Sequence, residues 1–253
     1  MGNFAEPPLT GKRVLVTGGS RGLGRGIAEA MAAAGARVAI AARTQEQVDR
    51  AAREIAGVSG FVFDIGDFER TPQFLAAVEE SLGGALTSVV HSAGIQHRQP
   101  AEEFDLDAFR NVIEVNLVAP FALSQAIARR QLELGMEGEH IFIGSLTSFI
   151  SMPGISAYGA AKSGVFGLVR SLSTEWSGRG IRVNGIAPGY FRTDLTEAVF
   201  ADEEWRRTHL ARIPQGRFGE PSDIASVAVF LASPASGYMT GQMLPVDGGW
   251  LAA

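Results

Sequence analysis

The stretch Lys12-Arg-Val-Leu-Val-Thr-Gly-Gly-Ser-Arg-Gly-Leu-Gly24 joins an apolar run to a cluster of glycines, and the Ala-rich segment 27–34 follows it. Its first half predicts a buried strand, and the segment after the glycines predicts a helix. A glycine loop at the start of a helix lets the backbone and the free helix amides approach a pyrophosphate closely. The stretch therefore predicts a strand–loop–helix unit that binds a dinucleotide, although a glycine cluster by itself also fits a plain turn.

The rest of the chain repeats this alternation. Short apolar runs predict further strands at 37–42, 61–64, 88–91, 140–144, 181–187 and 242–246. Helices are predicted at 44–56, 67–82, 105–134, 157–178 and 222–232, with Asp67 as the N-cap of the second of these. Strands that are apolar on both faces and separated by helices are typical of a parallel sheet covered on both sides. We expect one α/β domain over 1–253, with about seven parallel strands and an irregular substrate-binding insertion over about 189–217.

Composition and charge narrow the range of partners. The 253 residues carry a net charge of −5, which disfavours nucleic acid, since phosphate binding normally requires a basic face. The chain has no Cys, and its four His lie without metal-ligand spacing, so no metal site is expected. It has neither an apolar run of about 18 residues nor a basic leader followed by an apolar core. We therefore expect no membrane span and no signal peptide, and the cytoplasm is the simplest location.

Tyr158 and Lys162 stand four residues apart, which places both side chains on one face of the helix predicted over 157–178. Lys12 and Lys162 are the only lysines among 22 basic residues, so the ordinary surface cation of this chain is arginine. A lysine in such a chain calls for a reason, although the pair alone is more typical of an amphipathic helix than of a catalytic site. The pair alone still fits a packed tyrosine beside a solvated lysine.

The end of the second predicted strand bears on the choice of nucleotide. The residues there are Ala41-Ala42-Arg43-Thr44, without the carboxylate that would bind a ribose 2′-hydroxyl. Arg43 and Arg21 can both form charge-assisted, forked hydrogen bonds with a 2′-phosphate. The sequence therefore favours NADP(H) over NAD(H), unless both arginines are simply solvated.

The ordered motifs of the chain resemble the short-chain dehydrogenase/reductase family over about residues 10–250. These motifs are TGGSRGLG at 17–24, Asp64, Ser92-Ala93-Gly94, Asn116, Ser145, Tyr158-x-x-x-Lys162, Asn184 in RVNGIAPG, Pro188-Gly189 with Thr193, and Val246-Asp247-Gly248-Gly249. One departure is His91-Ser92, where family members commonly show Asn-Asn before Ala-Gly. The resemblance implies a doubly wound Rossmann fold, a homotetramer, and hydride transfer between NADP(H) and an alcohol or ketone.

The resemblance also implies roles for the matching positions. Asn116, Ser145, Tyr158 and Lys162 match the catalytic tetrad. Together with Arg21 and Arg43, the expected cofactor-binding residues are Gly18, Ser20, Gly22, Leu23, Gly24, Asp64, Ile65, Ser92, Ala93, Gly94, Tyr158, Lys162, Pro188, Gly189 and Thr193. Asp64 would hold the adenine ring, and Asn116 would hold a water that links Lys162 to solvent.

The proposed chemistry needs these residue types. Reduction of a ketone leaves an alkoxide that must gain a proton, and oxidation requires the reverse, so one group must exchange a proton near neutral pH. The ordinary pKa of tyrosine, about 10, is too high for a good base, and a positive charge beside the phenol would lower it. Lys162 and bound NADP⁺ can supply that charge, and Ser145 can hydrogen-bond the substrate oxygen. Ser145 alone would also fit a serine that ends a strand.

Substrate is expected to contact the segments 95–99, 146–156 and 189–217, which lie beyond the carboxyl ends of the strands. The candidate contacts are Gln96, Arg98, Ser145, Tyr158 and Arg192. The sequences GIQHRQP, GYFRTDL and VDGGWL are similar to those of gluconate and deoxygluconate dehydrogenases of the family. This similarity implies a sugar acid, with its carboxylate held by Arg98 or by an arginine of the long connection. A 3-oxoacyl carrier-protein reductase and a non-catalytic NADP(H) sensor are the alternatives.

Overall fold

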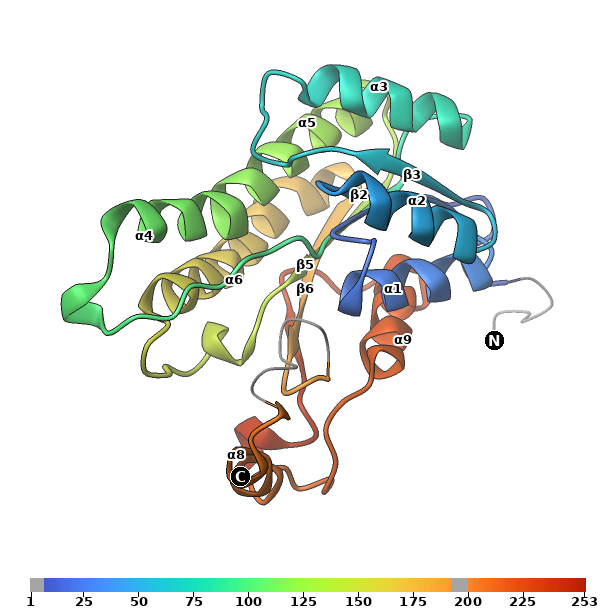
Figure 1. Ribbon diagram of the computed structural model, residues 1–253. Helices are drawn as coiled ribbons and strands as arrows, with labels where there is room; N and C mark the ends of the chain where they lie inside the picture. Colours follow the sequence, from blue (N-terminus) through green and yellow to red (C-terminus); the bar gives the residue numbers. More distant parts are fainter. Residues whose placement is uncertain (1–6, 193–199) are drawn as a thin grey trace.

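The computed structural model describes residues 7–192 and 200–253, which are built around one seven-stranded parallel sheet (Figure 1). The strand order is β3-β2-β1-β4-β5-β6-β7. The strands are β1 (Arg13–Thr17), β2 (Arg37–Ala42), β3 (Val58–Val62), β4 (Ser88–His91), β5 (Gly138–Ile143), β6 (Ile181–Pro188) and β7 (Met243–Val246). The chain winds outward from β1 to β3 and then returns to β4 beside β1. This topology confirms the predicted doubly wound α/β fold and places its switch point between β1 and β4.

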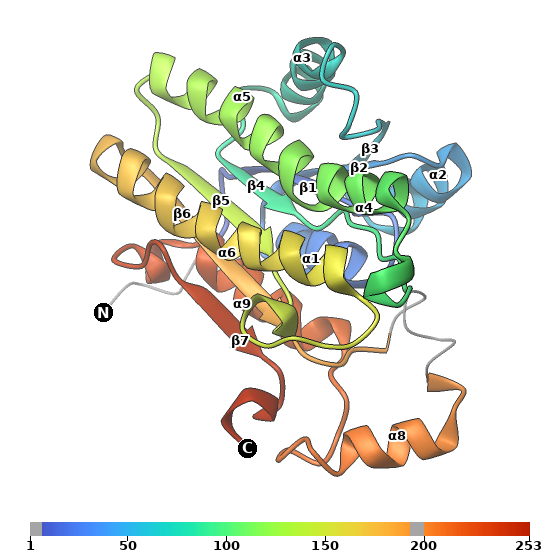
Figure 2. The same cartoon turned by 90° about the vertical axis from the view of Figure 1, so that its left-hand side faces the viewer.

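Helices cover both faces of the sheet (Figure 2). One layer contains α1 (Gly22–Ala33), α2 (Gln45–Glu54) and α9 (Pro221–Ala232), whose apolar side chains share a core with the sheet. The opposite layer contains α3 (Thr71–Leu82), α4 (Leu106–Ile113), α5 (Ala119–Glu133) and α6 (Ser156–Trp176). Beyond the carboxyl end of β6 lies α8 (Glu203–Leu210), close to the C-terminus in Figure 1.

Three local predictions were wrong. The third strand spans Val58–Val62 rather than 61–64. It includes Gly60, where a Cβ would lie 2.8 Å from the Val48 side chain, so this position accepts only glycine without a shift of its neighbours. Asp67 does not cap α3; its carboxylate accepts from the amide of Arg70, 3.2 Å away, and Arg70 is the N-cap. The helix α8 lies inside the connection that was predicted to be irregular, and it has no buried residue to reveal it by periodicity.

The continuous helical segment from Leu106 to Glu133 is long and apolar enough to cross a membrane by length and composition, with a mean hydropathy of 1.3 in its most apolar window. Buried residues make up 44% of that window. Leu123 and Ile127 of this segment pack against the sheet. In this fold the segment is a core helix.

A chain of buried hydrogen bonds runs beneath α5. The side-chain amide of Gln131 donates to the carbonyl of Leu86 (3.0 Å), which leaves its oxygen to accept from Nε2 of His140 (3.0 Å). His140 therefore accepts at Nδ1 from Ser124 (2.9 Å), whose oxygen accepts in turn from Nε2 of His91 (2.7 Å). The acceptor role of Nδ1 requires the imidazole of His140 to be neutral. Burial lowers the pKa of His140 to about 3, and burial followed by the charge of His140 lowers that of His91 well below its usual value.

The neutral state of His140 predicts a pH-dependent stability. The unfolded chain regains the ordinary pKa of about 6.5, so unfolding takes up a proton between about pH 3 and 6.5. The free energy of unfolding contributed by this residue therefore falls as the pH falls through that window. In urea titrations between pH 6.5 and 5, we expect the slope for His140→Gln to be smaller than that of the wild type by about 1 kcal/mol per pH unit. His97→Gln, at an exposed position, should keep the wild-type slope. Equal slopes for His140→Gln and the wild type would contradict this assignment.

Candidate active site

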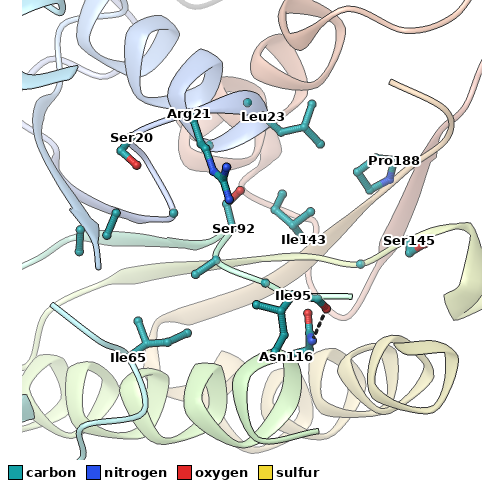
Figure 3. A pocket seen from close by; sticks show the side chains of 18 of the residues that line it. Ser20, Arg21, Leu23, Ile65, Ser92, Ile95, Asn116, Ile143, Ser145 and Pro188 are labelled. Carbon is teal, nitrogen blue, oxygen red and sulfur yellow. Dashed lines mark hydrogen bonds between the residues drawn. The ribbon is translucent and has the colours of Figure 1, made fainter. Parts of the chain in front are cut away.

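A cavity of about 280 Å³ opens at the carboxyl ends of the strands, over the switch point (Figure 3). The loop after β1, the ends of β2 and β4, and the start of α6 all contribute to it. Its lining includes Gly18, Ser20, Arg21, Gly22, Leu23, Gly24, Ala42, Arg43, Ile65, Ser92, Ala93, Gly94, Asn116, Ser145, Tyr158, Lys162, Pro188 and Gly189. The fold thus brings most of the predicted cofactor residues and all four predicted tetrad residues to one cavity.

The glycine loop is shaped for close backbone contact. Gly18 has a φ of +67°, and a Cβ there would lie 2.8 Å from the backbone of Ala93. A Cβ at Gly24 would overlap the carbonyl of Gly18. The N-cap residue of α1 is Arg21, whose side chain makes no capping bond and extends into the cavity, so the first amides of α1 remain available to an anion (Figure 3). These features fit the pyrophosphate of a dinucleotide.

The far end of the cavity suits an adenosine group. Ala42 and Arg43 at the end of β2 line it together with Phe63 and Ile65. Asp64 is exposed and does not belong to this lining; its carboxylate accepts from the amide of Gly66 at 3.0 Å. Gln47 of α2 lines the same end of the cavity but was not predicted. Its only signal in the sequence is its position four residues after Arg43.

The opposite end holds the side chains with reactive chemistry. Ser145 follows β5 and accepts at Oγ from the amide of Thr147 at 3.2 Å. Tyr158 lies in the first turn of α6, and Lys162 lies one turn later. The ammonium nitrogen of Lys162 donates to the carbonyl of Ile143 at 2.7 Å and lies 5.6 Å from the centroid of the Tyr158 ring. Tyr158 and Lys162 are therefore neighbours in space, as their helical spacing predicted, and both line the cavity.

Burial governs the proton affinity of this pair. Burial raises the pKa of Tyr158, and the side chain of Ser145 acts in the opposite direction. Burial also lowers the pKa of Lys162, to about 8. In the protein alone, loss of hydration outweighs the effect of Ser145, so the pKa of Tyr158 is raised. The lowering expected from Lys162 together with NADP⁺ concerns the nucleotide-bound state and stays a prediction.

Asn116 lies in a π-helical turn, Glu114–Val118, between α4 and α5. Its amide nitrogen donates to the carbonyls of Ile95 (2.8 Å; Figure 3) and Val112 (2.9 Å). Its side-chain oxygen is buried and has no hydrogen-bond partner among the described residues. The π-helical turn thus directs the side-chain amide of Asn116 into the cavity. Such turns are frequent at functional sites.

The remaining predicted residues lie outside this cavity. Gln96 and Arg98 belong to the loop after β4, which is joined to the 146–156 segment by the bond from the amide of Gln99 to the carbonyl of Gly154 (2.9 Å). Arg192 lines a separate hollow against α8. Thr193 lies outside the described residues.

Comparison with known proteins gives consistent matches over nearly the whole chain. The family model described as enoyl-(acyl carrier protein) reductase matches residues 18–251. Gluconate 5-dehydrogenase from Gluconobacter oxydans is 39% identical and covers 95% of each chain, and 2-dehydro-3-deoxy-D-gluconate 5-dehydrogenase from Bacillus subtilis is 41% identical and covers 96% of each. The solved structure of a gluconate 5-dehydrogenase from Burkholderia cenocepacia, in complex with NADP and tartrate, has a TM-score of 0.92 at 36% identity over 97% of each chain.

These matches agree with the site built from the residues. The parallel sheet, the glycine loop and the Ser145–Tyr158–Lys162 group occur in one chain at the positions that the sequence motifs indicated. The relatives are long enough, and similar enough, to establish the relationship over the full fold. The chain belongs to the short-chain dehydrogenase/reductase family of oxidoreductases that act on CH–OH groups.

Proposed function

We propose that this enzyme transfers hydride between NADP(H) and an alcohol or ketone group of a sugar acid of the gluconate or deoxygluconate type. The observation that carries the proposal is one cavity with a dinucleotide cradle at one end and Ser145, Tyr158 and Lys162 at the other. The similarity to gluconate and deoxygluconate dehydrogenases supports the substrate class. In this proposal the whole chain acts as one domain, and the connection over about 189–217 forms the substrate-binding part.

The chain's own residues provide the proton transfer. A bound nicotinamide supplies or accepts the hydride. In oxidation, Tyr158 accepts the hydroxyl proton of the substrate, and Ser145 hydrogen-bonds the same oxygen and stabilises the charge that forms on it. Lys162 favours the phenolate by its charge, and Asn116, with a buried oxygen free to bind a water, connects Lys162 to solvent. Reduction uses the same groups in reverse.

The preference for NADP(H) rests on charge at the adenosine end. Arg21 and Arg43 both line the cavity, and Ala42 stands where a carboxylate would repel a 2′-phosphate. Both guanidinium groups are free of carboxylate partners among the described residues. They can therefore form forked hydrogen bonds with a phosphate.

The assembly and location are part of the proposal. We place the enzyme in the cytoplasm as a homotetramer without nucleic-acid or membrane partners, in line with the charge of −5 and the family resemblance. Exposed apolar side chains at Val118, Phe149 and Ile150, beside α5 and α6, offer a surface for such an assembly.

A 3-oxoacyl carrier-protein reductase is the second candidate. Two observations favour it: the description of the matching family model names an acyl carrier protein reductase, and the exposed arginines Arg21 and Arg43 line the cavity. An acidic carrier protein would require such a basic surface.

A substrate panel separates the two candidates. We expect the wild type to oxidise D-gluconate with NADP⁺ at a kcat/KM at least about tenfold above that for any neutral polyol, because only the acid engages the arginines. We also expect it to leave acetoacetyl thioesters almost unreduced with NADPH. NADPH absorbance measures both reactions. Preferential turnover of the thioesters would favour the carrier-protein reductase.

The role of Tyr158 predicts a selective loss of chemistry. Tyr158→Phe keeps the ring but removes the group that exchanges the proton, so kcat should fall by about a thousandfold. The dissociation constant of NADPH, measured by fluorescence titration, should change by less than about threefold. Tyr238→Phe, at a fully exposed position, is the control and should behave like the wild type. Activity of Tyr158→Phe within tenfold of the wild type would refute the assignment.

The cofactor assignment predicts an effect confined to one nucleotide. Arg43→Gln removes a charge-assisted bond to the 2′-phosphate, so kcat/KM for NADPH should fall by about tenfold or more. The value for NADH, which lacks that phosphate, should stay within about twofold. Arg50→Gln, an exposed arginine of α2, should alter neither. A wild type that uses NADH better than NADPH would overturn the preference.

A further inference from the structure

A cluster of apolar and aromatic side chains lies just beyond the reactive end of the cavity. It contains Leu146, Ile213 and Trp250, with Met152, Tyr190, Phe218 and Leu251 packed against them. Leu146 directly follows Ser145 in the chain. The cluster therefore joins three segments that meet beside the reactive serine: the loop after β5, the long connection and the C-terminal segment.

Tyr190 is the polar member of this cluster that can bond a ligand through a hydroxyl group. Its ring contacts Trp250 edge to face, with centroids 4.8 Å apart, and His209 in the same way at 5.0 Å. Its hydroxyl lies 3.7 Å from the sulfur of Met152, in the 146–156 segment. A thioether is a weak acceptor, so this phenol has hydrogen-bonding capacity that its protein neighbours do not use fully. Tyr190 also directly follows Gly189, which lines the reactive cavity.

Arg212 stands over the same cluster. Its guanidinium carbon lies 4.1 Å from the centroid of the Trp250 ring, a stacking arrangement that holds the group in place. Within 7–192 and 200–253, no hydrogen bond engages its side-chain N–H groups. Neither Arg212 nor Arg98 has a carboxylate partner among the described residues. Burial raises the pKa of Tyr190, and the charges of Arg212 and then Arg98 both oppose this shift, so both guanidinium groups act on the phenol. The phenol remains protonated at neutral pH and can donate.

We propose that Arg212, held on Trp250, and the hydroxyl of Tyr190 bind the carboxylate of the substrate and select acids over neutral polyols. The inference rests on the proposed sugar-acid activity and identifies which arginine of the long connection performs this task. A carboxylate would receive a charge-assisted bond from the guanidinium and a second bond from the phenol. The charge of Arg98, in the loop after β4, also acts on the Tyr190 hydroxyl. A polyol with CH₂OH in place of the carboxylate gains little from these groups.

Paired substrates of equal chain length test this site. D-gluconate and D-sorbitol differ only in the carboxylate end and its replacement by CH₂OH. For Arg212→Gln, we expect the KM for D-gluconate to rise at least about tenfold with kcat within about twofold, and the KM for D-sorbitol to stay unchanged. Tyr190→Phe, which keeps the aromatic packing, should raise the KM for D-gluconate by a smaller factor. Arg212→Lys should restore part of the loss, since it keeps the charge without the planar stack.

Arg207→Gln is the matched control, because Arg207 also belongs to the long connection but its side chain is 80% exposed and pairs with Glu204. It should leave both KM values unchanged. The melting temperature and the dissociation constant of NADPH report the integrity of each variant. An unchanged KM for D-gluconate in Arg212→Gln, or equal increases for both substrates, would overturn the carboxylate site while leaving the proposed function intact. A wild type that oxidises no sugar acid would overturn the proposed function and the site with it.

Discussion

The close backbone contact between Gly18 and the residues after β4 sets the geometry on which the site depends. Because a Cβ at position 18 would lie 2.8 Å from the Ala93 backbone, only glycine lets the loop after β1 rest against the end of the neighbouring strand. The winding of the chain changes direction at this same point. The glycine loop comes from the first half of the sheet, and Asn116, Ser145 and Tyr158 come from the second. The contact therefore fixes the glycine loop relative to Asn116, Ser145 and Tyr158.

Burial at the reactive end of the cavity disfavours the phenolate form of Tyr158, and the side chain of Ser145 alone does not offset this effect. Loss of hydration raises the pKa of Tyr158 and lowers that of Lys162, so both shifts favour the neutral forms. The phenolate needed for oxidation becomes accessible when further positive charge lies beside it, and an oxidised nicotinamide carries such a charge. The protein alone thus holds Tyr158 in the form that donates a proton. In the proposed mechanism, nucleotide binding and proton transfer are coupled through this shared electrostatic balance.

The sequence predicted the sheet and the cavity lining well, because both depend on local patterns. The apolar run over Arg37–Ala42 has the bounds of β2. Features that depend on packing were not predictable. Gly60 lies outside the strand predicted over 61–64 but belongs to β3, where it packs against Val48. The helix α8 is charged and is held in place by aromatic contacts of Trp205 and His209. The π-helical turn at Asn116 and the direction of the Tyr158 pKa shift depend on burial that a linear sequence does not display.

Lysine suits position 162 for two reasons: few hydrogen-bond acceptors surround its side chain, and the proposed function needs a group that can exchange a proton. Arg182, at the amino end of β6, uses its planar fork to bind the carbonyls of Ser236 (3.0 Å) and Leu231 (3.1 Å). Among the described residues, the buried ammonium of Lys162 has one acceptor, the carbonyl of Ile143, and a guanidinium there would leave several donors without partners. A guanidinium also keeps its proton at any pH the protein meets, whereas burial brings the pKa of Lys162 to about 8. In a chain that otherwise uses arginine, lysine at this position provides a compact charge that can take part in proton exchange near neutral pH.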